Sequence, residues 1–194
     1  MEADNLLVER AKQGDMIAFS ELVIRHQKSL LRLAFRVVRD LQTAQDVVQE
    51  SFLKAHQKLR SFEGRSAFKS WVFQITLNTA KNKLRSRTFE TVDFEKTPIS
   101  DDVDIEGALM NEDLKEMIQS EIEKLPAKQK IALNLRIFDD LSFSEIAEVM
   151  ACPYDTAKAN YRHALMKLRH RLGDALVIEG WHNHKHKDLL EADA

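Results

Sequence analysis

The stretch SFEGRSAFKSWVFQITLNTAKNKLRSR, residues 61–87, carries the helical pattern around which the rest of the chain is organised. Ser66 is a suitable helix cap, and no Gly or Pro interrupts the sequence from there to residue 87. At about 100° per residue, apolar side chains cover most of the circumference of such a helix. The remaining polar arc is narrow and carries amides and cations, with an aromatic on its edge: Gln74, Asn78, Lys81, Arg85 and Trp71.

The same stretch is strongly basic. Between Arg60 and Thr88 the sequence has seven Lys or Arg and one acid, Glu63, for a net charge of +6. An apolar helix with a thin cationic stripe beside an aromatic suits a polyanion with stackable bases. The alternative, from these residues alone, is a solvated basic face on a core helix.

Composition indicates an all-α protein. The 194 residues are 44% hydrophobic and 31% charged, which is enough apolar material for one domain or two small ones. Only five Gly and three Pro interrupt long helical periodicities. A single Cys152 excludes an internal disulfide framework and fits a reducing compartment. No apolar run approaches the roughly 18 residues of a membrane span, and the N-terminus lacks a secretory signal, so we expect a cytoplasmic protein.

The net charge of −2 hides an uneven distribution. Residues 89–125 hold twelve acids and three lysines, for a net charge of −9. Residues 156–172 hold five Lys or Arg and no acid. Two basic blocks therefore flank an acidic one, and each could bind a polyanion despite the mean charge.

A third helix is expected to start at Thr43, with Asp46 three residues on as in a capping box. Its buried stripe would hold Val48, Phe52, Ala55 and Leu59. Acids and amides line another face: Asp46, Gln49, Glu50 and Gln57. This face is either a protein docking surface for basic groups or ordinary solvated helix surface.

The loop between this helix and the basic one contains an aromatic residue, Phe62, beside Gly64. Phe62 either stacks on an unpaired base or seals the corner between the two helices. Beyond the basic helix, residues 88–107 lose periodicity and combine Pro98 and Gly107 with acids, as in an extended acidic linker. We therefore expect domains at 1–87 and 108–173 and a C-terminal tail at 174–194.

The second domain contains the pattern of a helix-turn-helix. Ser142 and Glu145 form a capping box for a short helix, and Asp155 is expected to cap a last, basic helix that ends near Leu172. The inward face of the last helix would hold Ala157, Tyr161, Ala164, Leu168 and Leu172. Its outer face would carry groups suited to a DNA major groove: Lys158, Ala159, Asn160, Arg162 and His163.

Three histidines alternate with other residues in the tail, at His182, His184 and His186. This spacing can gather a transition metal in a flexible peptide. We favour a disordered polar tail without metal, and the sequence predicts no cofactor.

In combination, three stretches closely resemble an extracytoplasmic-function (ECF) RNA polymerase sigma factor of the sigma-E type. They are LLVERAKQGDMIAFSELVIRHQ, DVVQESFLKAHQKLRSFEGRSAFKSWVFQITLNTAKNKLR and LPAKQKIALNLRIFDDLSFSEIAEVMACPYDTAKANYRHALMKLR. The resemblance covers about residues 4–172. It implies two α-helical domains, sigma region 2 and sigma region 4, joined by a flexible linker, and a specificity subunit rather than an enzyme.

The resemblance also implies partners and sites. Core RNA polymerase would bind through its β′ clamp helices and β flap, promoter DNA through both domains, and an anti-sigma factor would hold the protein inactive. The implied clamp-helix contacts are Asp46, Gln49, Glu50, Phe52, Leu53 and Gln57. The implied contacts with the melted minus-ten element are Ser61, Phe62, Arg65, Ser66, Lys69, Trp71, Gln74, Asn78, Lys81 and Arg85. The implied contacts with the minus-thirty-five element are Thr156, Lys158, Ala159, Asn160, Arg162, His163 and Lys167.

Two departures from the family pattern bear on DNA binding. Gln74 stands where members often carry Arg. The recognition helix is Thr-Ala-Lys-Ala-Asn at residues 156–160, where T-V-[KR]-S-R is common, so we expect an altered or weaker minus-thirty-five preference. The rival hypothesis is a stand-alone helix-turn-helix regulator that binds duplex DNA with residues 108–172.

Overall fold

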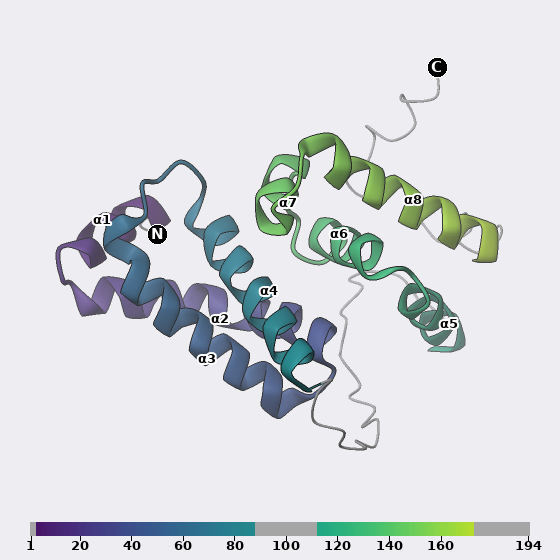
Figure 1. Ribbon diagram of the computed structural model, residues 1–194, viewed down its shortest axis with the longest axis horizontal. Coiled ribbons are helices and arrows are strands. Elements are labelled where there is room, and N and C mark those ends of the chain that lie inside the picture. Colours follow the sequence, from purple (N-terminus) through teal and green to yellow (C-terminus); the bar gives the residue numbers. More distant parts are fainter. Residues whose placement is uncertain (1–2, 88–111, 173–194) are drawn as a thin grey trace. The chain divides into compact units, whose positions relative to one another are not determined.

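The computed structural model describes residues 3–87 and 112–172, and within them every regular element is a helix (Figure 1). The predicted acidic linker and the histidine tail lie outside the described residues. Contacts group the chain into two units, Met1–Ile99 with Leu135–Ala157, and Ser100–Asn134 with Lys158–Ala194. Each unit is described by itself. None of the helices in the described parts is long and apolar enough to cross a membrane.

The N-terminal part is a bundle of α-helices in which α2, α3 and α4 pack on one another and α1 packs on α2. The helices are α1 (Asp4–Lys12), α2 (Met16–Val38), α3 (Leu41–Lys58) and α4 (Phe68–Arg87), with a 3-10 turn, η1 (Leu59–Ser61), after α3. The predicted stripe of the third helix is confirmed, because all four of its residues are buried. Apolar burial at about 25 cal/mol per Å² is the main force that holds such a bundle together.

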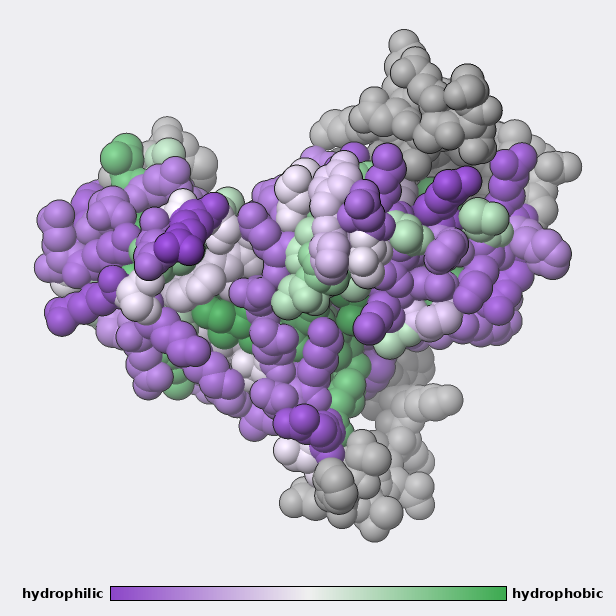
Figure 2. Space-filling view, turned by 45° about the horizontal axis from the view of Figure 1, so that its top comes forward, coloured by the Kyte–Doolittle hydropathy of each residue, from purple (hydrophilic) through white to green (hydrophobic). Residues whose placement is uncertain are grey.

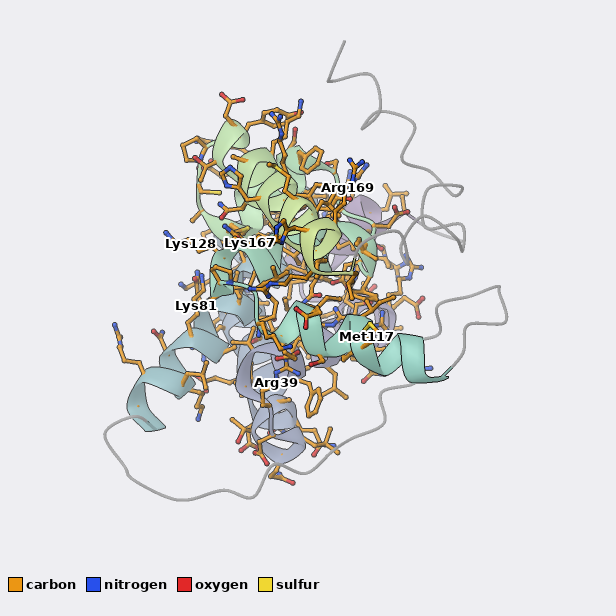
Figure 3. The ribbon with its side chains drawn as sticks, turned by 90° about the vertical axis from the view of Figure 1, so that its right-hand side faces the viewer. Arg39, Lys81, Met117, Lys128, Lys167 and Arg169 are labelled. Atoms are coloured by element: carbon orange, nitrogen blue, oxygen red, sulfur yellow. The ribbon has the colours of Figure 1, made fainter. Side chains whose placement is uncertain are left out.

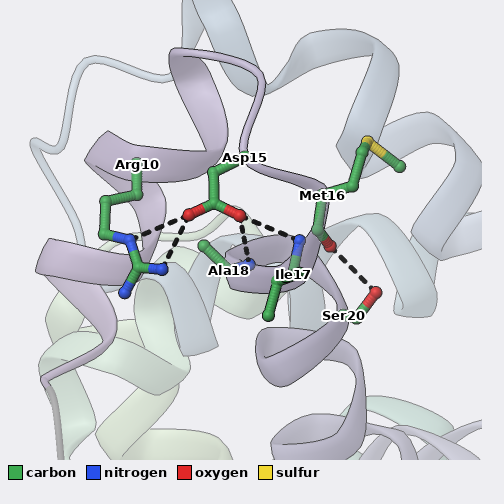
Figure 4. Close-up of polar contacts among 6 residues, drawn as sticks. All are labelled: Arg10, Asp15, Met16, Ile17, Ala18 and Ser20. Carbon is green, nitrogen blue, oxygen red and sulfur yellow. Dashed lines mark hydrogen bonds and ion pairs between the residues drawn. The ribbon is translucent and has the colours of Figure 1, made fainter.

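Asp15 caps α2. One carboxylate oxygen of Asp15 accepts hydrogen bonds from the backbone N–H groups of Ile17 and Ala18, at 2.9 and 3.1 Å. The other oxygen pairs with the guanidinium of Arg10 in α1, at 2.7 Å (Figure 4). The backbone bond from Ala18 and the bond from Arg10 lower the pKa of Asp15. One side chain thus closes the α1–α2 turn and starts the second helix.

Three predicted helix caps are wrong by one to three residues. Asp40, not Thr43, caps α3, since its carboxylate accepts the Thr43 N–H at 2.8 Å. The first backbone bond of α4 is accepted by the carbonyl of Ala67 rather than by Ser66. In the last helix the first backbone hydrogen bond is accepted by the carbonyl of Pro153, and Asp155 lies inside the first turn.

The helix-turn-helix lies among the later helices of the chain. They are α5 (Glu112–Glu123), α6 (Ala127–Ile137), α7 (Phe143–Met150) and α8 (Tyr154–Leu172). The Ser142–Glu145 capping box of α7 is confirmed, with both reciprocal bonds present. All five predicted inward residues of α8 are buried. In α6 Leu135 is buried, whereas Ile131 is half-buried.

Most of the surface visible in Figure 2 is hydrophilic, and hydrophobic residues show in a few patches. Several large apolar side chains in the described residues are nonetheless exposed, among them Ile17, Ile24 and Leu53 on α2 and α3. Scattered exposed apolar residues are normal on a protein surface.

Candidate nucleic-acid interface

Three aromatic rings meet where the loop after η1 enters α4, and we call Phe62, Phe68 and Trp71 the aromatic cluster. Phe62 and Trp71 stack with ring centroids 4.6 Å apart and an interplanar angle of 29°. Phe68 lies against both rings, at 6.3 and 5.9 Å. Phe62 is only 8% exposed and Phe68 1%, whereas Trp71 is half-buried. Trp71 is therefore the ring of the cluster that a ligand can reach most easily.

The polar stripe of α4 continues from the cluster toward the C-terminal end of the helix. Asn78, Lys81 and Arg85 are exposed. Figure 3 shows Lys81 projecting from α4. The guanidinium of Arg85 lies 3.4 Å from the side-chain oxygen of Asn82. An amide and two cations at helical spacing can contact base edges and phosphates along one strand.

Lys69 and Gln74, two other predicted DNA contacts, are hydrogen-bonded within the first unit. Lys69 Nζ donates to the carbonyl oxygen of Asp139 at 2.7 Å. Gln74 Nε2 donates to the carbonyl oxygen of Glu148, in α7, at 2.8 Å. Both side chains are half-buried. In this conformation their donors are thus used by backbone acceptors rather than offered to solvent.

Apart from the buried Phe62, the predicted DNA contacts around the loop are at least partly accessible. Ser61 and Arg65 are exposed, and Ser66 is half-buried. Arg65 pairs with Glu63 at 2.6 Å, with the Arg65 side chain 85% exposed. An ion pair this exposed is worth at most about 1 kcal/mol, so an approaching phosphate could replace Glu63. Gly64 has a φ of 71°, a left-handed conformation that favours glycine and tightens the loop.

A groove of about 800 Å³ runs between α2 and α3. Its lining is Met16, Phe19, Val23, Gln27, Lys28, Leu31, Gln42, Gln45, Asp46, Val48, Gln49, Phe52, Leu53 and His56. It therefore contains four of the six predicted polymerase contacts. Phe52 is buried at 8% exposure, and Leu53 projects with 61% exposure. Among its polar lining residues are one acid, Asp46, and four glutamines, so the groove is suited to an amphipathic helix with polar or basic residues beside its apolar face.

Glu50 and Gln57 fall outside the groove lining. Glu50 pairs with Lys54 at 2.7 Å on its own helix and with Lys83 of α4 at 3.5 Å. The hydrogen bond from Lys54 is the largest of the causes that lower the pKa of Glu50. Glu50 therefore ties α3 to the basic helix. The sequence analysis missed Lys54 and Lys83; the four-residue spacing from Glu50 would have revealed Lys54.

The predicted major-groove residues of α8 lie on its outer side. Asn160 is half-buried, and the others are exposed: Thr156, Lys158, Ala159, Arg162, His163 and Lys167. Lys167 and Arg169 are labelled on α8 in Figure 3. In the described residues no three His, Cys, Asp or Glu side chains gather as metal ligands. The three tail histidines lie outside those residues.

Helix α1 makes two contacts beside the aromatic cluster that the sequence analysis missed. His26 of α2 is 8% exposed, and its Nε2 is hydrogen-bonded to Oδ2 of Asp4 in α1 at 2.7 Å. The centre of its ring lies 5.6 Å from that of Phe68. Lys12 Nζ lies 5.7 Å from the centre of the Phe62 ring. His26 could have been found, since it falls four residues from Leu22 and from Leu30 on the buried face.

Comparison with known proteins gives two domain matches. Residues 22–90 match sigma-70 region 2, and residues 115–168 match sigma-70 region 4. The RNA polymerase sigma-H factor of Pseudomonas aeruginosa is 38% identical over 169 residues, which cover 81% of this chain and 88% of the relative. The ECF RNA polymerase sigma-E factor of Escherichia coli K12 is 37% identical over 167 residues, covering 80% and 87%.

Two solved structures have the same fold. The sigma factor RpoE of Bartonella quintana, in complex with the anti-sigma factor NepR, matches with a TM-score of 0.64 and 26% identity, over 79% of this chain and 96% of that one. CnrH, in complex with the cytosolic domain of CnrY, matches with a TM-score of 0.66 and 24% identity, over 90% and 99%. The protein belongs to the sigma-70 family, as an ECF sigma factor of the sigma-E type.

Proposed function

We propose that this alternative sigma factor holds core RNA polymerase with the α2–α3 groove and opens promoter DNA along α4. The observation that carries the proposal is the placement of both surfaces on one small bundle. The groove lies between α2 and α3, and the aromatic cluster with Asn78 and Lys81 lies on α4, which packs on both of those helices. Docking on polymerase would thereby fix the position of the DNA-opening surface.

The energetics explain why the two surfaces belong together. Extruding a base from a duplex costs a few kcal/mol. Stacking that base on an aromatic side chain returns roughly 1–3 kcal/mol. Since Trp71 is the accessible ring of the cluster, the bundle can capture one or two bases and needs polymerase to hold the separated strands. The sigma factor thus supplies specificity and a first captured base, and no catalytic chemistry.

The proposal assigns the minus-ten element to α4 and the minus-thirty-five element to α8. The exposed Lys158 and Arg162 can reach base edges, and Lys167 can reach a phosphate nearer the C-terminal end of the helix. Ala159 lacks the hydroxyl that Ser would offer, and Asn160 lacks the charge that Arg would carry, at the same places. We therefore expect duplex binding by α8 to be weak without polymerase, which separates the proposal from a stand-alone regulator.

An anti-sigma factor is the regulatory partner that we propose. The Bartonella quintana relative forms a complex with such a protein. Polymerase and inhibitor would contact the same residues of the α2–α3 groove, the exposed Leu53 and the buried Phe52 beside it. Competition for one groove would keep the protein inactive until the inhibitor leaves. Because it would act on core polymerase, we propose that the sigma factor works in the cytoplasm.

The test is transcription by core polymerase with and without the purified chain. We expect sequencing of RNA 5′ ends after overexpression to yield a promoter, and the chain to direct transcription from it in vitro. A chain that does not bind core polymerase would end the proposal. Tight binding to duplex DNA without polymerase, unchanged by deletion of residues 1–87, would instead support the stand-alone regulator.

A further inference from the structure

We propose that helix α1 positions the aromatic cluster for base capture, with Asp4 and Lys12 as its two positioning residues. This inference rests on the proposed function of α4. The cluster needs a support because Phe62 belongs to the loop after η1, whereas Phe68 and Trp71 belong to α4. A ring held in a loop contributes to binding only if its conformational freedom is already restricted before the base arrives.

The first support is a partly buried polar contact. Asp4 Oδ2 lies 2.7 Å from His26 Nε2, and Asp4 Oδ1 lies 2.9 Å from Arg25 Nη1. The carboxylate therefore holds two neighbouring side chains of α2 at once. His26 in turn packs against Phe68, which is 1% exposed and touches both other rings of the cluster. A shift of the imidazole would be transmitted to Phe68, because close-packed interiors do not absorb displacement.

The second support holds the loop. Helix α1 packs against η1, the turn that leads directly into Phe62. Lys12, in the last turn of α1, lies over the Phe62 ring and pairs with Glu9 at 2.8 Å. A cation over an aromatic ring is attracted to the negative face of its π-system. The ring of Phe62 is thus held between Lys12 and the stacked Trp71.

The test uses the full chain with Trp181→Phe, which leaves Trp71 as the sole tryptophan. Asp4→Ala removes the first support, and Lys12→Met removes the second while keeping much of the side-chain length. Lys12→Arg keeps the cation and should rescue. Glu21→Gln is the matched control, since it breaks the 2.8 Å ion pair to Arg25 and leaves the Asp4–His26 contact in place.

Three measurements are made on each variant. The first is Trp71 emission and its quenching by acrylamide without DNA, and the second is binding to core polymerase. The third is promoter opening by the holoenzyme, detected by the permanganate reactivity of unpaired bases. We expect Asp4→Ala and Lys12→Met to shift the Trp71 emission to the red and to increase its quenching. Both variants should also reduce the yield of open complexes roughly fivefold, which is less than the full loss of one base–aromatic stack would cause. Core binding should not change, and Lys12→Arg and Glu21→Gln should behave as the parent chain does.

The proposal is overturned if the emission and the opening of Asp4→Ala match those of the parent. It is equally overturned if Glu21→Gln lowers opening as much, or if core binding falls in parallel, since either result would indicate a general loss of structure. A parent holoenzyme that opens no promoter would refute the proposed function instead. In that case an altered Trp71 emission in Asp4→Ala would still support the positioning of the cluster by α1.

Discussion

The ring of Phe62 stacks on the ring of Trp71 at 4.6 Å, with Phe62 almost completely buried beneath it. An exposed loop aromatic would have been a direct partner for a flipped base. The observed stack favours the other role considered for Phe62, that of sealing the corner between two helices. The base would then stack on Trp71 and find Phe62 behind it.

This division of roles predicts different results for the two rings. Trp71→Ala should reduce promoter opening roughly tenfold, the worth of one base–aromatic stack, and should change core binding little. Phe62→Leu keeps most of the buried volume but loses the stack on Trp71 and the contact with Lys12, so it should reduce opening about fivefold, as Lys12→Met does. Phe62→Ala leaves a cavity against Phe68 and should lower the free energy of unfolding by about 3 kcal/mol, measured by urea denaturation. Opening by Phe62→Leu that falls as far as in Trp71→Ala would show that Phe62 itself stacks on the base.

The α2–α3 groove predicts which exposed apolar residue binds core polymerase. Leu53 is 61% exposed and lines the groove, whereas Ile24 is 62% exposed on α2 and does not line it. Leu53→Asp should weaken core binding roughly tenfold or more, because a charge would be buried in the contact. Ile24→Asp makes the same change at the same exposure and should bind normally. Fluorescence anisotropy with labelled sigma factor measures both; equal losses would contradict the assignment of the groove.

Glu50 predicts a pH dependence of stability. Its pKa is lowered in the folded state, chiefly by the hydrogen bond from Lys54. The stability that it contributes is therefore present above the pKa of an unfolded Glu, about 4.3, and is lost as the pH falls through the lower folded value. Glu50→Gln should destabilise the chain at pH 7 by less than about 1 kcal/mol, since the pair is exposed, and by less still near pH 3.

The control for Glu50 is a double-mutant cycle with Lys54→Met, in which urea denaturation measures the free energy of unfolding at each pH. In that background Glu50→Gln should have a smaller effect at pH 7, because its main partner is gone. A Glu50→Gln effect that persists unchanged at low pH would show that the ion pair is not its cause.

Local sequence patterns predicted the helices well because side chains three or four residues apart share a face whatever the rest of the chain does. The buried face of α8 and the capping box at Ser142 follow from that rule alone. The cap of α3 was misplaced because Thr43 and Asp40 are both good caps, and the choice depends on where the preceding helix ends.

The arrangement of the candidate site could not be predicted in the same way. Phe62 lies outside any periodic pattern, so its burial depends on Trp71 and on the approach of Lys12 from α1. The pairing of Glu50 with Lys83 likewise joins two helices, and only their packing brings these charges together. Contacts between elements decide whether a residue faces a ligand or its own protein, and sequence spacing carries no information about them.

Ala151 ends α7 in a left-handed conformation, with φ 51° and ψ 53°, and the Cys152 N–H bonds back to the carbonyl of Ala147 at 3.0 Å. An L-residue with a Cβ atom costs roughly 1–2 kcal/mol in this conformation, which glycine avoids at helix ends. Ala151→Gly should therefore raise the free energy of unfolding by up to about 1 kcal/mol, after the greater backbone entropy of glycine is subtracted. Ala159→Gly, in the interior of α8, is the matched control and should lower it by about 1 kcal/mol. Urea denaturation of the two variants measures both effects, and destabilisation by Ala151→Gly would show that the turn is not strained.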